Sequence, residues 1–139
     1  MLQDIYHYID QQYDFLIRTR RYLHQHPELS FQEKKTAQYI ARFYQEHEID
    51  VRTGVGGNGV VARIKGAKPG KTVALRADFD ALPIQDEKTV PYRSRVPGVM
   101  HACGHDGHTA ILLGVARTLH HFRDQLAGEY VLLHQHAAE

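Results

Sequence analysis

The chain concentrates side chains that bind metal ions into one short segment. Residues 100–108 read Met-His-Ala-Cys-Gly-His-Asp-Gly-His, and they hold three of the 11 histidines and the single cysteine. Thiolate, imidazole and carboxylate groups are the ligand types that bind Zn²⁺ and similar divalent ions. The two glycines allow the backbone to fold tightly around such an ion. The segment therefore predicts a metal site.

The spacing within this segment favours the same interpretation. Cys103 and His105 are two residues apart, so in an extended segment their side chains point to the same side. His105 and His108 are three residues apart at the start of a predicted helix, which places them on one helical face. Asp106 could accept a hydrogen bond from a ligand imidazole and so fix its orientation.

Other roles for the single cysteine can be weighed against metal binding. Structural zinc sites of the finger or ribbon type use two or more cysteines, so one cysteine excludes that class. A nucleophilic Cys103 remains an alternative, because neighbouring imidazoles can lower the pKa of a thiol and activate it against a carbonyl carbon. A redox role is disfavoured, since the chain has no second cysteine to act as its partner.

Composition places the chain among ordinary soluble domains. It has 139 residues, of which 42% are hydrophobic and 24% are charged. A net charge of +1 gives no field that would favour nucleic acid or an anionic membrane as a partner. The N-terminus lacks the basic and apolar regions of a signal peptide, and no apolar stretch approaches the ~20 residues that cross a bilayer. We therefore expect a cytoplasmic protein.

The elements that must position the metal segment can be predicted from periodicity. Apolar residues recur with helical spacing over residues 2–23 and again over residues 31–47, which predicts two amphipathic helices. His26-Pro27 separates them, because proline disfavours helix in the residue before it. Ser30 precedes Glu33 by three residues, which predicts a capping box at the start of the second helix.

The middle of the chain changes to strands and turns. Residues 60–64 and 72–77 are rich in β-branched side chains and are joined by a turn that contains glycine and proline, which predicts a β-hairpin. Residues 78–100 show no sustained periodicity and are expected to form a long irregular loop. A helix from Gly107 and a buried strand over residues 129–134 follow. The fold class is α/β, with a mixed sheet flanked by helices.

Four segments together resemble the hippurate hydrolase group of metal-dependent N-acyl-amino-acid amidohydrolases. In chain order they are RYLHQHPELSFQE (residues 21–33), LRADFDALPI (75–84), the metal segment (100–108) and HQHAAE (134–139). The group is related to the plant auxin-conjugate hydrolases and more distantly to aminoacylases and carboxypeptidases. The resemblance identifies residues 1–139 as the N-terminal portion of a truncated metallopeptidase catalytic domain. It implies that the smaller domain for dimerisation and for closing over the substrate is absent.

The resemblance also implies which residues hold metal and what reaction follows. Cys103, His105 and Glu139 match protein ligands of two divalent ions (Zn²⁺, Mn²⁺, Co²⁺ or Ni²⁺), and the cysteine bridges both ions. Asp78 matches a carboxylate that supports a ligand from outside the coordination sphere. Such ions lower the pKa of water to about 7 and polarise a carbonyl group. The implied reaction is hydrolysis of the amide bond of N-acyl or N-aroyl amino acids, or of small peptide-like substrates.

One position departs from the pattern of the family. The general base of the group is the first glutamate of a Glu-Glu pair, and this chain has Ala138-Glu139. A methyl group cannot accept a proton, so we expect weak or no activity, and a non-catalytic metal-binding or interaction fragment is the alternative. Ending the sheet after residues 129–134 would also expose the apolar residues Val131, Leu132 and Leu133 on an edge strand, which predicts homo-oligomerisation or aggregation.

Overall fold

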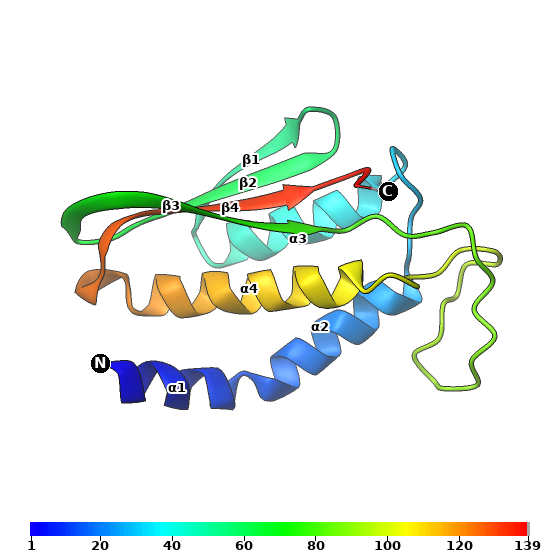
Figure 1. Ribbon diagram of the computed structural model, residues 1–139, viewed down its shortest axis with the longest axis horizontal. Helices are drawn as coiled ribbons and strands as arrows, with labels where there is room; N and C mark the ends of the chain where they lie inside the picture. Colours follow the sequence, from blue (N-terminus) through cyan, green and yellow to red (C-terminus); the bar gives the residue numbers. More distant parts are fainter. Residues whose placement is uncertain (139) are drawn as a thin grey trace.

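The computed structural model describes residues 1–138 and packs its helices against one face of a four-stranded sheet (Figure 1). This confirms the predicted α/β class with a mixed sheet. The helices are α1 (Leu2–Gln11), α2 (Tyr13–Gln25), α3 (Lys34–Glu46) and α4 (His105–His121), with a short 3₁₀ turn η1 (Arg123–Gln125). The strands are β1 (Asp50–Val55), β2 (Gly59–Lys65), β3 (Lys68–Asp78) and β4 (Ala127–Gln135).

The N-terminal helical region is bent, so the prediction of one helix over residues 2–23 is wrong. Gln12 separates α1 from α2 with φ −91° and ψ 4°, and Figure 1 shows the change of direction there. The Gln12 side chain is buried and donates a hydrogen bond to the Thr118 hydroxyl of α4 at 2.8 Å. The bend allows both α1 and α2 to pack against α4. This tertiary contact leaves no signal in the local periodicity.

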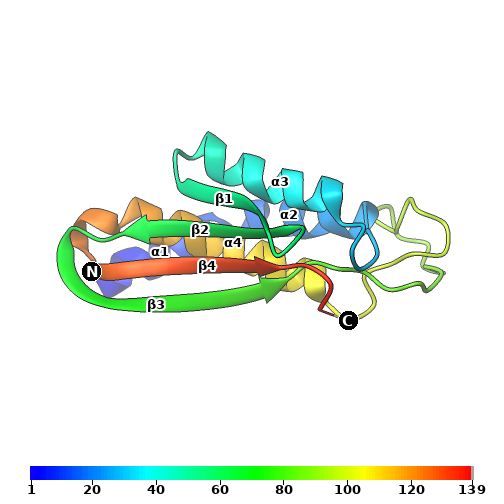
Figure 2. The same cartoon turned by 90° about the horizontal axis from the view of Figure 1, so that it is seen from above.

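The strand order is β1-β2-β4-β3, so the predicted hairpin of β2 and β3 is also wrong. β4 lies between them, antiparallel to β2 and parallel to β3. Strands β3 and β4 are therefore joined through α4 in a β-α-β unit, as a parallel pair requires. Figure 2 shows the four strands from above, with α4, α1 and α2 behind them.

Gly66, which lies between β2 and β3, and Gly70, near the start of β3, serve a close backbone approach rather than a tight hairpin. A Cβ atom on Gly66 would lie 2.5 Å from the Leu126 carbonyl oxygen, and one on Gly70 would lie 2.7 Å from the Gly128 nitrogen. The connection from β2 to β3 therefore passes directly over the start of β4. Glycine at both positions is the residue that such contact permits.

The apolar strand β4 is internal, which overturns the expected exposed edge. Leu132 pairs with Ala62 of β2 on one side and with Leu75 of β3 on the other. Its side chain is fully buried in the core. The described part of the chain thus gives this strand a hydrogen-bonded neighbour on each side. The expectation of oligomerisation through that edge loses its basis.

The core lies between this sheet and helices α3 and α4. Its fully buried members include Ile40 and Tyr44 of α3, Leu113 and Ala116 of α4, and Ala62 and Leu132 of the sheet. Fully burying a leucine or isoleucine side chain contributes roughly 1.5–3 kcal/mol. Packing α4 beneath the sheet fixes the position of its first turn relative to the ends of β3 and β4.

Helix α3 starts without the predicted capping box. It begins at Lys34, and the Glu33 side chain makes no cap hydrogen bond. Instead the Glu28 carboxylate accepts hydrogen bonds from the backbone amides of Lys35 (3.3 Å) and Thr36 (2.6 Å). A carboxylate from the preceding turn therefore satisfies the free amides of the first helical turn.

The long irregular connection between β3 and α4 is confirmed. Residues 79–104 contain only isolated bridges, Leu29 with Ala81 and Leu82 with Met100. This segment projects beyond the end of the sheet, shown in green to yellow in Figure 1. The carboxyl ends of the parallel strands β3 and β4 and the amino end of α4 meet at the same place. In open α/β sheets this is the edge at which ligands bind.

Candidate metal centre

Three side chains with metal-binding atoms converge at the carboxyl end of β3. One ligand atom from each of Asp78, His105 and His108 lies within 4.8 Å of the other two. Asp78 is the last residue of β3, and the two histidines occupy the first turn of α4. The Asp78 carboxylate lies between the two imidazoles, 2.8 Å from His108 Nδ1 and 3.4 Å from His105 Nε2.

The His105 ring is oriented by the Asp80 residue. His105 Nδ1 lies 2.9 Å from the Asp80 carbonyl oxygen and 2.9 Å from its carboxylate oxygen Oδ1. Both oxygens are acceptors, so Nδ1 carries the ring proton and donates it. The other carboxylate oxygen of Asp80 accepts a hydrogen bond from the Ser30 hydroxyl at 2.9 Å. A histidine that ligates metal is commonly held by a carboxylate in this way.

This arrangement fits a divalent cation. Nδ1 of His105 is engaged by Asp80, so Nε2 is the ring nitrogen that faces a carboxylate oxygen of Asp78, at 3.4 Å. A divalent cation bound between these two atoms would contact an imidazole nitrogen on one side and a carboxylate oxygen on the other. Imidazole nitrogen and carboxylate oxygen are ligands of Zn²⁺ and of related divalent ions. The donor set therefore matches the ions that the sequence predicts.

Backbone geometry fixes both sides of the site. Gly104 precedes α4 with φ 94°, a left-handed conformation that glycine adopts without strain. The Thr109 hydroxyl in the same helix donates a hydrogen bond to the Asp78 carbonyl oxygen at 2.7 Å. The end of β3 is thus tied to the first turns of α4. The aspartate and the two histidines are held by the same packing contact.

The predicted site residues are only partly brought together. Asp78 and His105 lie side by side, whereas Cys103 is exposed and stands outside the three-residue group. Glu139 lies outside the described residues, so its role stays a prediction. His108 was not in the predicted ligand set, although its three-residue spacing from His105 was the signal that would have included it.

Asp106 makes a contact that was not predicted. Its Oδ2 atom lies 2.7 Å from Nδ1 of His24, a residue of α2. Arg20 of the same helix lies 2.9 Å from the same oxygen. Asp106 therefore ties α4 to α2. The sequence offered no means of pairing residues 82 positions apart.

His101 sits within the same buried region as a neutral imidazole. Burial lowers its pKa from 6.5 to about 4, and the negative charge of Asp106 acts in the opposite direction. Neither ring nitrogen has a hydrogen-bonding partner among the described residues. A neutral imidazole in this position is available as a hydrogen-bonding group at neutral pH.

Comparison with known proteins shows which family the chain resembles. The model of peptidase family M20/M25/M40 matches residues 74–139, which include the end of β3, the long loop, α4 and β4. Over this stretch the chain is similar to peptidase family M20. The matched stretch contains every residue of the candidate metal centre that the structure describes.

The relatives agree with this similarity. The chain is 61% identical over 131 residues to the Bacillus subtilis (strain 168) protein YhaA, covering 94% of this chain and 33% of the relative. It is 49% identical over 137 residues to the N-acyl-L-amino acid amidohydrolase of Geobacillus stearothermophilus, covering 99% of this chain and 37% of the relative. The chain therefore spans about a third of the length of these relatives.

A solved structure carries the same fold. The Bacillus subtilis YXEP protein, described as a dinuclear metal-binding peptidase of the M20 family, superposes with a TM-score of 0.85 at 46% identity. The match covers 89% of this chain and 35% of the YXEP chain. Among the described residues, no helix is long and apolar enough to cross a membrane.

Proposed function

We propose that residues 1–139 form the N-terminal portion of an M20 catalytic domain that hydrolyses the amide bond of N-acyl amino acids with divalent metal ions. One observation carries the proposal. Asp78 lies between His105 and His108 at the carboxyl end of β3, with His105 held by Asp80. The name of the Geobacillus relative supports the substrate class, and the description of YXEP supports two metal ions.

Each residue has a distinct proposed role. Asp78 and His105 would ligate a metal ion directly, which assigns Asp78 a closer role than the sequence predicted. His108 would hold the second oxygen of Asp78 or ligate an ion itself. Cys103 and Glu139 complete the ligand set by resemblance. The metal ions would supply Lewis-acid activation of water and of the amide carbonyl.

The chain's own residues orient these ligands. The hydrogen bond from His105 Nδ1 to Asp80 leaves Nε2 as the ring nitrogen that faces Asp78. The bond from Thr109 to the Asp78 carbonyl oxygen holds the strand end against α4. What the chain lacks is a proton acceptor at Ala138, where the family has a glutamate. A general base contributes roughly 10²–10⁴ in rate, so hydrolysis by this chain is expected to be weak or absent.

Isothermal titration calorimetry with Zn²⁺ and Mn²⁺ tests the metal site. The expected result is stoichiometric binding to the unmodified chain and loss of binding in His105→Ala and Asp78→Asn. His7→Ala, at an exposed residue of α1, is the matched control and should bind metal as the unmodified chain does. Absence of binding to the unmodified chain, or equal binding by all variants, contradicts the proposal.

A non-catalytic metal-binding role is the second candidate, and Ala138 is the observation that favours it. Hydrolysis of hippurate by the unmodified chain and by Ala138→Glu separates the two candidates. A gain of at least roughly 10² in rate on restoring the carboxylate supports the hydrolase. Metal binding without hydrolysis by either protein supports the non-catalytic role.

The nucleophilic-cysteine alternative has its own test. Cys103 is exposed and so is accessible to alkylation. If Cys103 ligates metal, Zn²⁺ should slow its reaction with iodoacetamide, because the coordinated thiolate is no longer free to attack. An alkylation rate that metal leaves unchanged supports a free thiol instead.

A further inference from the structure

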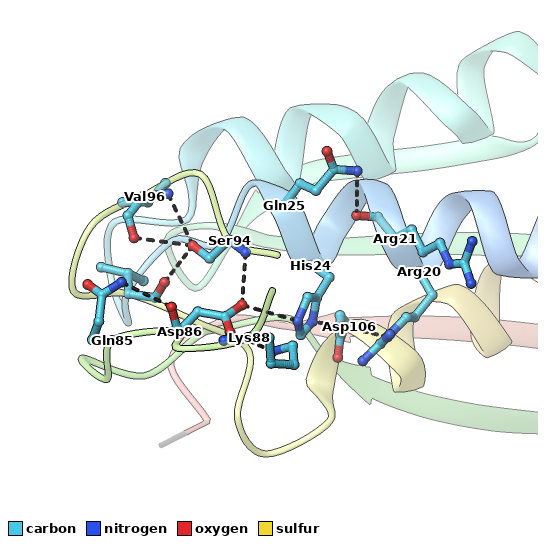
Figure 3. A network of polar contacts seen from close by, with 11 residues as sticks. Arg20, Arg21, His24, Gln25, Gln85, Asp86, Lys88, Ser94, Val96 and Asp106 are labelled. Carbon is cyan, nitrogen blue, oxygen red and sulfur yellow. Dashed lines mark hydrogen bonds and ion pairs between the residues drawn. The ribbon is translucent and has the colours of Figure 1, made fainter. Parts of the chain in front are cut away.

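A network of polar contacts joins α2, the first turn of α4 and the long loop (Figure 3). Its central residue is His24 of α2, whose side chain is 2% exposed. His24 Nδ1 lies 2.7 Å from Asp106 Oδ2 in the first turn of α4. On the other side of the ring, His24 Nε2 lies 3.6 Å from Asp86 Oδ2 in the long loop. One imidazole thus stands between two buried carboxylates from distant parts of the chain.

Asp106 is held in this network by two donors on one oxygen. Arg20 Nε approaches Oδ2 to 2.9 Å, in addition to the 2.7 Å contact from His24. Both donors are one turn apart on α2, so they act from the same helical face. Asp106 is 1% exposed, and hydrogen bonds to a buried carboxylate are stronger than those in water. These contacts fix the first turn of α4 against α2.

Asp86 anchors the loop to the same point. It accepts hydrogen bonds from the Ser94 amide at 2.9 Å and from the Lys88 ammonium group at 2.8 Å. Burial acts to raise the pKa of Asp86, but these hydrogen bonds outweigh it and hold the pKa below its ordinary value. Asp86 is therefore a carboxylate at neutral pH. The loop consequently presents a fixed negative charge to His24.

The position of Asp106 connects this network to the metal site. Asp106 lies between His105 and His108 in the sequence of the first turn, and their side chains emerge from the same helical turn. Any rotation or translation of that turn moves Nε2 of His105 and Nδ1 of His108 relative to Asp78. A shift of about 0.5 Å is enough to impair a site that depends on preorganised ligands.

We propose that His24 is a positioning residue for the metal ligands, acting through Asp106. The hydrogen bond from His24 Nδ1 sets the first turn of α4 so that His105 and His108 meet Asp78. His24 Nε2 approaches Asp86 only to 3.6 Å, beyond hydrogen-bond distance, and this approach does not set the ligands. This inference rests on the proposed metal-dependent function. It adds His24, whose contacts are with Asp106 and Asp86 and not with the proposed metal ligands Asp78, His105 and His108.

Two substitutions of His24 separate its two contacts. In His24→Asn the side-chain amide nitrogen occupies the place of Nδ1, so the bond to Asp106 can be kept while the contact to Asp86 is lost. In His24→Gln the amide nitrogen occupies the place of Nε2, so the opposite contact is kept. Both variants remove a buried imidazole and are expected to lower the melting temperature by similar amounts.

The experiment measures the dissociation constant for Co²⁺ and the visible absorption spectrum of the Co²⁺ complex. His24→Gln should raise the dissociation constant about tenfold and alter the spectrum, because losing an outer contact of a metal site typically costs 10–100-fold in affinity. His24→Asn should keep both readouts close to those of the unmodified chain. The spectrum reports ligand geometry, which a loss of stability alone does not change.

A matched control removes a different buried hydrogen bond to α4, at the end of α4 far from its first turn. Gln12→Met breaks the bond to Thr118 and should lower the melting temperature without changing Co²⁺ affinity. Arg20→Gln provides a second reading if His24→Gln does not fold, because Arg20 is 39% exposed and its loss is tolerated more easily. It should weaken Co²⁺ binding in the same direction.

The outcomes distinguish this inference from the function on which it rests. If the unmodified chain binds no Co²⁺, the proposed function fails. If the unmodified chain binds Co²⁺ while His24→Gln and Arg20→Gln bind equally well, the positioning role is overturned. Equal weakening by His24→Asn and His24→Gln, in proportion to their melting temperatures, also overturns it.

Discussion

The buried carboxylate of Glu33 accepts a hydrogen bond at 2.5 Å from the backbone amide of Ala137, a residue 104 positions further along the chain. Glu33 is 0% exposed, and Asn58 Nδ2 approaches its other oxygen at 3.5 Å. Ala137 has φ 50°, a left-handed conformation that costs a non-glycine residue roughly 1–2 kcal/mol. Glu33 therefore holds a strained turn directly before Ala138.

Removing this carboxylate is predicted to destabilise the chain. In Glu33→Ala the part-buried amide of Ala137 loses its acceptor, and a fully buried unsatisfied group costs about 1–3 kcal/mol, which sets the upper limit of the loss. The free energy of unfolding from urea denaturation measures the loss. Glu33→Gln keeps one acceptor oxygen and should lose less. Equal losses in the two variants would show that the acceptor does not hold the turn.

Acid is predicted to destabilise the chain through His134. Burial lowers the pKa of His134 from 6.5 to about 3, and its Nε2 atom accepts a hydrogen bond from the hydroxyl of Tyr44. Burial also raises the pKa of Tyr44, so the hydroxyl remains the donor. As the pH falls from about 6.5 to about 3, the unfolded chain binds a proton that the folded chain does not bind. Stability present above pH 6.5 is therefore lost as the pH falls through this window.

The pH effect can be isolated by a double variant. His134→Leu with Tyr44→Phe removes both partners, so no buried polar atom is left unpaired. The slope of unfolding free energy against pH should become shallower by up to about 1.4 kcal/mol per pH unit. His7→Gln, at an exposed histidine, is the control and should leave the slope unchanged. An unchanged slope in the double variant would contradict the assignment.

Gly128 is predicted to be irreplaceable for steric reasons. It has φ 82°, and a Cβ atom would lie 2.1 Å from the Lys71 carbonyl oxygen. Gly128→Ala therefore combines left-handed strain with a backbone clash, and we expect a loss of about 2–5 kcal/mol in urea denaturation. Gly98 has φ 74° and nothing within 4 Å, so Gly98→Ala measures the strain alone. The clash is refuted if both variants lose the same amount.

Divalent metal is predicted to stabilise the fold. A ligand that binds only the folded chain raises its stability by about 2.7 kcal/mol at a hundredfold excess over the dissociation constant. Zn²⁺ or Mn²⁺ should therefore raise the melting temperature, and EDTA should reverse the rise. Asp78→Asn removes the carboxylate between His105 and His108 and should abolish the shift. A shift of the same size in Asp78→Asn would place the bound ion elsewhere.

The local sequence pattern predicted most of the helices and strands, but not which of them pack or pair with one another. The long loop, the helix after it and the strand over residues 129–134 follow from periodicity and turn residues, and the structure confirms them. The break at Gln12 was missed because it depends on Thr118. The cap of α3 was missed because Glu28 and not Ser30 supplies it. Each error involves a partner that lies outside the local window.

Strand order was the largest error, and its cause is physical. A turn that contains glycine and proline predicts a hairpin when only the two flanking strands are considered. Here β4 inserts between β2 and β3, because a β-α-β unit allows a strand from later in the chain to pair in parallel. The glycines at the turn then relieve close backbone contact with β4.

The sequence by itself determined which side chains are available: the imidazole, thiol and carboxylate groups in residues 100–108, the carboxylates at and after the end of β3, and an alanine at position 138. Residue type and spacing are local properties, so they can be read without coordinates. Only the tertiary structure decided that Asp78 stands between His105 and His108, and that His24 of α2 holds Asp106 behind them. Those contacts depend on how α4 packs against the sheet and α2, which is decided by the whole core.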